Sequence, residues 1–162
     1  YALAVIMLCL VSASIGFLYW NWSPAKIFMG DVGSCSIGFL FGLFSIYTAK
    51  EEIIPISTWL IILAPFIGDA TFTLIKRMIN KEKWYEAHNT HAFQNLFQLG
   101  LSHSQLAIGL LIINLLFIWP LAIFAQFNQS YDLYVVLLAY ILVWIIWFIS
   151  HLKNNQNTES LS

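Results

Sequence analysis

Charged residues are scarce in this chain. Asp, Glu, Lys and Arg together make up 9% of its 162 residues, whereas 60% are hydrophobic. A soluble domain usually carries about 25% charged residues, and a soluble fold of this composition would leave large apolar patches in contact with water. The low charge therefore excludes an ordinary soluble globular protein and indicates a protein that lies in a membrane.

Cysteine is scarce too, and no charged region precedes the first apolar run. Cys9 and Cys35 both lie in apolar sequence, which favours small core residues over a disulfide, and their spacing is not that of a zinc site. The run after Tyr1 lacks the basic start and the small-residue cleavage site of a signal peptide. We therefore expect the chain to be the C-terminal part of a longer membrane protein.

Long apolar runs make up most of the sequence. A transmembrane helix needs about 20 residues, and five segments approach or exceed this length: 2–20, 34–48, 54–75, 104–126 and 133–151. Their continuous apolar character favours helices over the alternating pattern of a membrane β-barrel. Residues 1–152 are therefore predicted to form an all-α polytopic membrane helical bundle with about five transmembrane helices. The polar residues 153–162 are predicted to form a disordered cytoplasmic tail.

The basic residues are distributed unevenly between the loops. Six of the seven lie in alternate loops or in the tail, namely Lys26, Lys76, Arg77, Lys81, Lys83 and Lys153. By the positive-inside rule, this side faces the cytoplasm. The chain then starts outside and ends inside, and the loop around Lys26 and the segment 76–103 share the cytoplasmic face. These two polar segments are therefore expected to build one site at one membrane face.

A polar, glycine-bearing loop, PAKIFMGDVGS, separates the first two apolar segments and runs from Pro24 to Ser34. Asp31 is its carboxylate, and Mg²⁺ prefers a carboxylate together with phosphate oxygens and water. Gly30 and Gly33 allow the backbone to come close to a bound anion, and Ser34 is expected to cap the following helix. The alternative is a tight turn in which Asp31 only caps that helix.

Asp69 lies inside the third apolar segment, where an ionisable residue is unfavourable and is a functional candidate by default. It would lie about 9 Å deep if the helix leaves the membrane near Ile75, at 1.5 Å per residue. Pro65 and Gly68 are expected to bend the helix there. The alternative is a structural carboxylate bonded to a threonine or to the basic pair at residues 76–77.

His88 and His91 lie in the long cytoplasmic segment, three residues apart, with Asn95 four residues further. On a helix these residues would share one face. The pair could bind a metal, although no third ligand has zinc-type spacing, or it could donate hydrogen bonds to phosphate oxygens. The alternative is a polar loop with surface histidines.

Together these residues resemble the polyprenyl-phosphate N-acetylhexosamine-1-phosphate transferase superfamily (glycosyltransferase family 4), which includes the MraY and WecA enzymes. The stretch from Pro24 to Ser34 is very similar to the family's most diagnostic motif, and the segment from Pro65 to Asp69 is similar to its next feature. The sequence HNTHAFQ, which starts at His88, resembles the histidine loop of the O-antigen-initiating branch and differs from the tighter cluster of the MraY branch. The resemblance covers nearly the whole chain but only the C-terminal half of the family's fold.

The resemblance implies a reaction and its partners. A UDP-N-acetylhexosamine would give its sugar 1-phosphate to undecaprenyl phosphate, releasing UMP and initiating the synthesis of O-antigen or another cell-envelope polysaccharide. Mg²⁺ is the expected cofactor, with Mn²⁺ as an alternative, and no nucleic acid is expected as a partner. The protein would lie among membrane lipids in the bacterial inner membrane, with a homodimer as one expected assembly and with its active face in the cytoplasm.

The resemblance also implies roles for single residues. Asp31 and Asp69 are the expected catalytic residues, and Asp31 would hold the Mg²⁺ ion. The expected substrate-binding residues are Lys26, Phe28, Gly30, His88 and His91. An aromatic ring at Phe28 would stack on the uracil, and the two histidines would contact the diphosphate or the nucleotide. Phosphoryl transfer depends mainly on positioning and charge neutralisation, which such residues supply.

Two other interpretations stay open. A transporter subunit would explain Asp69 in a span bent by Pro65 and Gly68, but not why Asp31 and the histidine pair lie on one side, and no inverted repeat is visible. A catalytically incomplete remnant would fit a chain without the family's N-terminal half. A cytoplasmic Asp-Asp pair upstream of Tyr1 would favour the enzyme over the remnant.

Overall fold

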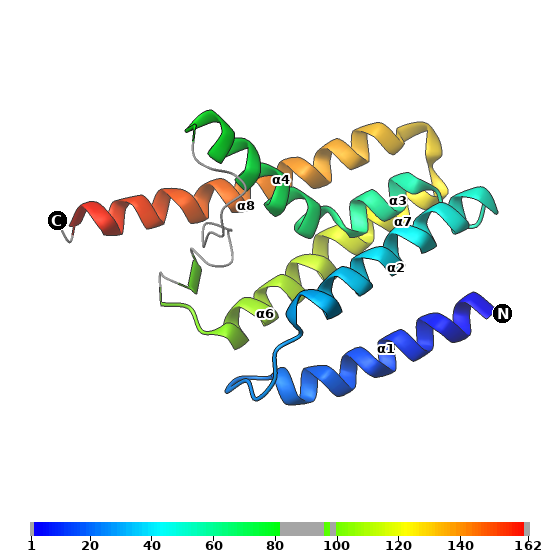
Figure 1. Ribbon diagram of the computed structural model, residues 1–162. Coiled ribbons are helices and arrows are strands. Elements are labelled where there is room, and N and C mark those ends of the chain that lie inside the picture. The colour runs from blue at the N-terminus through cyan, green and yellow to red at the C-terminus, as the bar shows by residue number, and fades with distance from the viewer. Residues whose placement is uncertain (1, 82–95, 98–99, 161–162) are drawn as a thin grey trace. The chain divides into compact units, whose positions relative to one another are not determined.

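The computed structural model describes residues 2–81, 96–97 and 100–160, and this part of the chain contains helices and no strand (Figure 1). The predicted all-α fold is therefore confirmed. Four helices are long and apolar enough to cross a membrane, and a fifth span results when the bent pair α3 (Ile56–Ile62) and α4 (Ala64–Ile79) is counted as one. The chain is thus a multi-pass membrane protein, as its apolar runs predict.

The helices belong to two compact units. The first unit, Tyr1–Gly42, contains α1 (Ala2–Asn21) and the first part of α2 (Gly30–Lys50). The second unit, Leu43–Ser162, holds the end of α2 and all later elements. These are α3, α4, α6 (His103–Ile113), the π-helix η1 (Asn114–Ile118), α7 (Trp119–Phe127), the 3₁₀ turn η2 (Gln129–Tyr131) and α8 (Asp132–Ser160).

α2 is longer than the apolar segment 34–48 that predicts it. The helix has 21 residues because the motif residues from Gly30 to Gly33 are helical as well. Gly30 has a φ of +64°, a left-handed conformation that glycine adopts without a steric penalty, and it turns the chain into the helix. The expectation of a short second span is therefore wrong, and α2 has the length of a full transmembrane helix.

The third apolar segment, predicted as one span, is broken. α3 and α4 meet at an angle of 72° around Leu63. Pro65 lies in the first turn of α4, where its missing N–H leaves no helical bond unmade, whereas inside a continuous helix its ring would clash with the carbonyl four residues earlier. The bend predicted from Pro65 is confirmed, but it is sharper than expected, and Gly68 lies beyond it inside regular helix.

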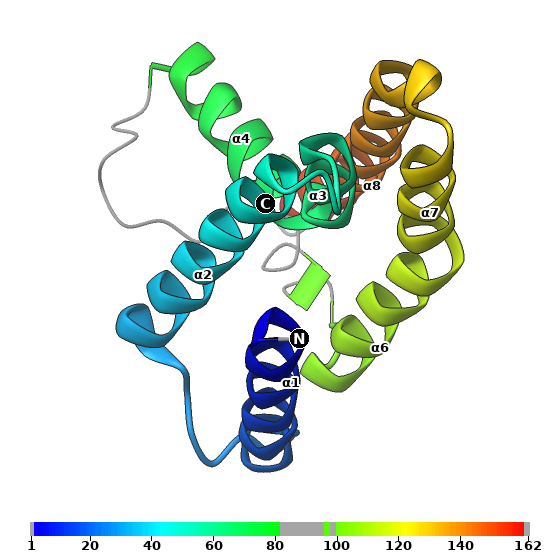
Figure 2. The ribbon, with the colours of Figure 1, turned by 90° about the vertical axis from the view of Figure 1, so that its right-hand side faces the viewer.

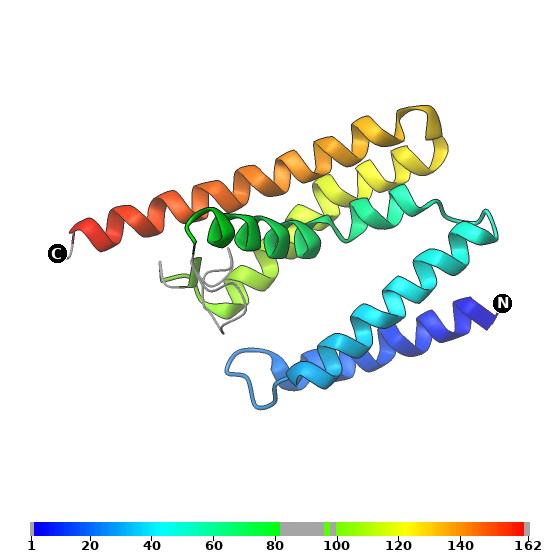
Figure 3. The same cartoon turned by 45° about the horizontal axis from the view of Figure 1, so that its top comes forward.

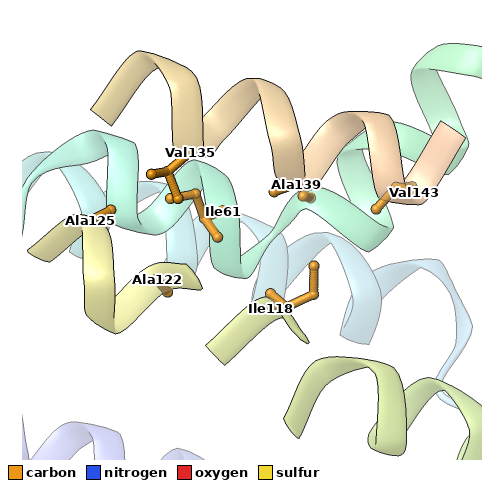
Figure 4. Packing of buried hydrophobic residues seen from close by; sticks show 8 residues of the cluster. Ile61, Ile118, Ala122, Ala125, Val135, Ala139 and Val143 are labelled. Carbon is orange, nitrogen blue, oxygen red and sulfur yellow. The ribbon is translucent and has the colours of Figure 1, made fainter. Parts of the chain in front are cut away.

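The core of the second unit lies between α3, α7 and α8 (Figure 4). Figures 2 and 3 show α8 running beside α7 and passing both halves of the broken span, and α8 packs on α3 and α4. Small residues recur among the buried side chains, which are Ile61, Ala64, Ile118, Ala122, Ala125, Val135, Ala139 and Val143. Alanines let helix backbones approach closely, and such packing drives association in lipid, where burial of apolar surface contributes little.

Polar side chains connect the helices at the end of the second unit where α8 begins. The Trp59 indole N–H donates to Thr48 Oγ1 (2.8 Å), and Ser57 Oγ donates to Asp132 Oδ2 (2.6 Å). Gln126 Nε2 donates to the carbonyl of Ile53 (2.9 Å). Hydrogen bonds between helices replace the water that lipid cannot offer, so these contacts fix how the ends of α2, α3, α7 and α8 meet.

α8 continues across residue 152, where the sequence predicts that the membrane domain ends. Its helical backbone extends to Ser160. The end of the membrane domain at this residue is not tested by the structure and stays a prediction. The disorder of residues 153–162 in a membrane stays a prediction as well.

α4 packs against α8 through a glycine. A Cβ added at Gly68 would lie 2.8 Å from Val143 Cγ1, closer than such atoms pack. Val143 is β-branched and has one strongly preferred rotamer in a helix, so it cannot move aside easily. Gly68 therefore lets α4 approach α8 closely, and it lies inside regular helix rather than at the bend.

Gly68→Ala is expected to lower the free energy of unfolding by about 1–3 kcal/mol, the usual effect of overpacking a core. Gly109→Ala is the matched control, because a Cβ on this glycine of α6 meets no atom within 4 Å and alanine favours helix by about 1 kcal/mol. Thermal unfolding in detergent measures both variants. Val143→Ala should restore the stability of Gly68→Ala, and an unchanged melting temperature in Gly68→Ala would contradict the close packing.

Candidate functional site

Asp31 lies in the first turn of α2, and its side chain is exposed. The free N–H groups of a helix N-terminus favour negative charge, from a carboxylate or from a bound anion. A Cβ at the neighbouring Gly30 would meet no atom within 4 Å, so the surface beside the carboxylate is open. The structure thus gives Asp31 the exposure that a metal ligand needs when substrate oxygens complete the coordination.

Ser34 does not act as the sequence predicts, and Gly33 packs against Met29. Ser34 lies inside α2, and its hydroxyl donates to the carbonyl of Asp31 (3.2 Å) instead of capping the helix. The prediction is wrong because the helix begins four residues earlier, at Gly30. The Met29 side chain covers the side of Gly33 where a Cβ would lie, with Cγ 2.5 Å from that position, so this glycine makes room for Met29, and its role beside an anion stays a prediction.

The connection between α1 and α2 is held by contacts to the end of α1. The backbone N–H of Lys26 donates to the carbonyl of Trp20 (3.0 Å), and the Lys26 ammonium lies 5.2 Å from the centre of the Trp20 ring. Asn21 Nδ2 donates to the carbonyl of Ile27 (2.8 Å). Phe28 is 83% exposed. The first unit therefore presents a restrained cation and a free aromatic ring on the segment that leads to Asp31.

Asp69 is half-buried in α4, in the second unit, directly after the packing residue Gly68. Asp31 belongs to the first unit. The expectation that the two carboxylates share one site therefore stays a prediction. His88 and His91 lie outside the described residues, and their roles stay predictions as well.

No group of three or more His, Cys, Asp and Glu residues that could hold a metal ion occurs within residues 2–81, 96–97 and 100–160. Mg²⁺ bound with substrate is usually held by one or two carboxylates together with phosphates and water. Asp31 fits as one such ligand. Its carboxylate is exposed, and the open surface at Gly30 leaves room for a diphosphate.

Comparison with known proteins places the motif in a family. A model of glycosyl transferase family 4 matches residues 1–49, which include α1, the connection and nearly all of α2. The chain is 31% identical over 157 residues to a Bacillus subtilis protein named "probable undecaprenyl-phosphate N-acetylglucosaminyl 1-phosphate transferase", an alignment that covers 93% of this chain. The chain belongs to the polyprenyl-phosphate hexosamine-1-phosphate transferase superfamily.

Phospho-N-acetylmuramoyl-pentapeptide-transferases match shorter parts of the chain. The phospho-N-acetylmuramoyl-pentapeptide-transferase of Orientia tsutsugamushi is 31% identical over 115 residues, which cover 71% of this chain and 31% of that protein. The Kocuria rhizophila enzyme of the same name is 49% identical over 49 residues, 30% of this chain and 13% of its own. No solved structure matches significantly. The chain spans less than half of these relatives, 43% in the case of the Bacillus protein.

The sequence analysis did not predict a buried, hydrogen-bonded pair of residues in the second unit. Trp147, which is 7% exposed, donates its indole N–H to Thr73 Oγ1 (3.0 Å), and Thr73 is 1% exposed. Both residues lie in apolar runs that the sequence treats only as spans. One signal was available, because a tryptophan within a span must find an acceptor for its N–H.

Proposed function

We propose that the full-length protein transfers an N-acetylhexosamine 1-phosphate from a UDP-sugar to undecaprenyl phosphate. The observation that carries the proposal is the exposed Asp31 carboxylate beside the open Gly30, at the N-terminus of α2, within the residues that the family model matches. The name of the Bacillus relative supports the acceptor lipid and the phospho-sugar donor. The product would enter O-antigen or another cell-envelope polysaccharide in the bacterial inner membrane, with the site on the cytoplasmic face.

The proposed reaction exchanges one phosphoanhydride bond for another. An oxygen of the lipid phosphate attacks the β-phosphorus of the UDP-sugar, and the bond from this phosphorus to the bridging oxygen breaks. UMP leaves with that oxygen, and the sugar phosphate stays on the lipid as a diphosphate. Mg²⁺ would supply neutralisation of the diphosphate charge.

The residues of the chain bind and orient the reactants in this proposal. Asp31 would hold the metal ion, and Lys26, which is restrained against Trp20, would add positive charge for the diphosphate. Phe28 stacks on the uracil with its exposed ring. Asp69 lines the pocket from α4.

His91→Ala is expected to reduce kcat/KM for the UDP-sugar more than tenfold, because hydrogen bonds from a histidine to phosphate oxygens are charge-assisted. His103→Ala is the control, since His103 stacks on Phe97 (4.4 Å between ring centres) at the start of α6. Steady-state kinetics in membranes measures both variants. Unchanged kcat and KM in His91→Ala would leave His91 as a surface residue.

The direct test is UMP release by the full-length protein in membranes, with undecaprenyl phosphate, Mg²⁺ and a panel of UDP-amino sugars. Release that depends on both lipid and Mg²⁺, with one sugar, is the expected result and names the substrate. No release with any sugar, from protein shown to be folded and inserted, would contradict the proposal and favour the remnant or the transporter subunit.

A further inference from the structure

Trp147 of α8 contacts three residues of α4. Its indole N–H donates to Thr73 Oγ1 at 3.0 Å, and its ring meets Phe72 edge-on with the ring centres 6.2 Å apart. The Lys76 ammonium lies 5.8 Å from the centre of the same ring. One side chain thus contacts a hydroxyl, an aromatic ring and a cation that all belong to α4.

The bond to Thr73 is protected from solvent on both sides. Trp147 and Thr73 are 7% and 1% exposed, and Ser150, one turn further along α8, is fully buried with its hydroxyl donating to the carbonyl of Trp147 (2.7 Å). A buried donor or acceptor that loses its partner has no water to replace it. The bond therefore favours one orientation of α4 over neighbouring ones.

The orientation of α4 decides where Asp69 points. α4 begins after the 72° break at Leu63 and packs more extensively against α8 than against α3, so contacts with α8 set the rotation of α4 about its axis. Thr73 follows Asp69 by four residues and lies on the same side of the helix. Gly68, the residue before Asp69, fixes the separation of the helices through its close approach to Val143.

We propose that Trp147 and Thr73 are positioning residues for phospho-sugar transfer, because their hydrogen bond fixes the rotation of α4 and with it the direction of the Asp69 carboxylate. This inference rests on the proposed function. Neither residue needs to touch substrate, and both act through Asp69.

The chain provides a matched control at the other end of the second unit. Trp59 donates its indole N–H to Thr48 Oγ1 at 2.8 Å, and the two residues are 8% and 0% exposed. The pair joins α3 to the end of α2 with the same chemistry and burial. No expected site residue lies on α3, and Asp31 lies at the opposite end of α2 from Thr48, in the other unit. Trp59→Phe and Thr48→Val therefore remove an equivalent bond without an expected effect on Asp69.

The test compares these variants in the full-length protein by thermal unfolding and by UMP release per folded molecule. Trp147→Phe keeps an aromatic ring and Thr73→Val keeps the shape, but each removes the bond. We expect each to lower kcat roughly tenfold, since small misplacements of reacting groups slow the chemical step. KM for the UDP-sugar should change less than about twofold. The double variant should be no slower than either single one, and Thr73→Ser, which keeps the hydroxyl, should retain activity.

A second comparison distinguishes a positioning role of Trp147 from a general effect on the stability of the protein. In an Asp69→Asn background, Trp147→Phe should change kcat by less than about twofold, because its effect passes through Asp69. Trp59→Phe and Thr48→Val should lose similar stability and keep kcat. Wild-type kcat in Trp147→Phe, or an equal loss of kcat in Trp59→Phe, would overturn the inference while leaving the proposed function intact. Absence of transfer by the unmodified protein would overturn the proposed function and this inference with it.

Discussion

Asp31→Asn is expected to lower phospho-sugar transfer by about a thousandfold or more while membrane insertion stays normal. The substitution keeps the size of the side chain and removes the charge that would hold Mg²⁺. Metal neutralisation of a transferring phosphoryl group contributes several kcal/mol, and each factor of ten corresponds to about 1.4 kcal/mol. Asp31 is exposed beside the open Gly30, so its carboxylate is accessible to a bound metal ion and is not buried in contacts inside the protein. UMP release in membranes, titrated with Mg²⁺, measures the effect.

Two controls distinguish a metal-binding role of Asp31 from a role in stabilising α2. Negative charge in the first turn stabilises a helix by about 0.3–1 kcal/mol, so a carboxylate that only stabilises α2 would lower the melting temperature of Asp31→Asn slightly and leave turnover unchanged. Ser36→Ala removes an exposed hydroxyl of α2 that donates to the carbonyl of Val32 (2.6 Å), and it should keep full activity. Near-normal turnover by Asp31→Asn would remove Asp31 from the reaction.

Asp69→Asn is expected to lower kcat roughly a hundredfold, the scale of losing one well-placed group that orients reactants or stabilises charge. Asn keeps the shape but removes the charge, so a merely structural Asp69 would lose melting temperature on this change and keep kcat. Asp132→Asn is the matched control, because Asp132 is also half-buried in the second unit but accepts from Ser57 Oγ (2.6 Å) at the start of α8.

The two aspartates should therefore give opposite results. Asp132→Asn weakens a short hydrogen bond and removes negative charge from a helix N-terminus, so it should lower the melting temperature and leave kcat unchanged. Asp69→Asn should lower kcat with a small effect on melting. A fall in melting temperature without a fall in kcat for Asp69→Asn would assign that residue to the structure alone.

The sequence predicts the spans well because a lipid environment leaves few choices. Each run of about 20 apolar residues must satisfy its own backbone hydrogen bonds, and a helix does so within the segment. The boundary of α2 was less predictable, because polarity marks the residues from Gly30 to Gly33 as a loop although they are helical. The break at Leu63 was also only partly predictable from the sequence. Pro65 indicates a bend, but the size and place of the bend depend on how α4 packs against α8.

The candidate site was predictable where its residues are adjacent in sequence. The motif around Asp31 is read directly from the chain, and the structure adds the positive φ of Gly30 and the exposure of Phe28. The bond between Thr73 and Trp147 was not predictable, because 74 residues separate its partners. Any of several threonines could accept from a given indole, and only the packing of the two helices selects one.

The central claim, transfer of a sugar together with its phosphate, is tested most directly by the fate of the β-phosphorus. The full-length protein in membranes is supplied with Mg²⁺, undecaprenyl phosphate and the UDP-sugar that supports turnover, carrying a radioactive label on the β-phosphorus only. We expect the label to enter the organic-solvent extract with the lipid while unlabelled UMP appears in the water phase. A label that stays in the water phase as UDP, or an absence of any labelled lipid, would contradict it.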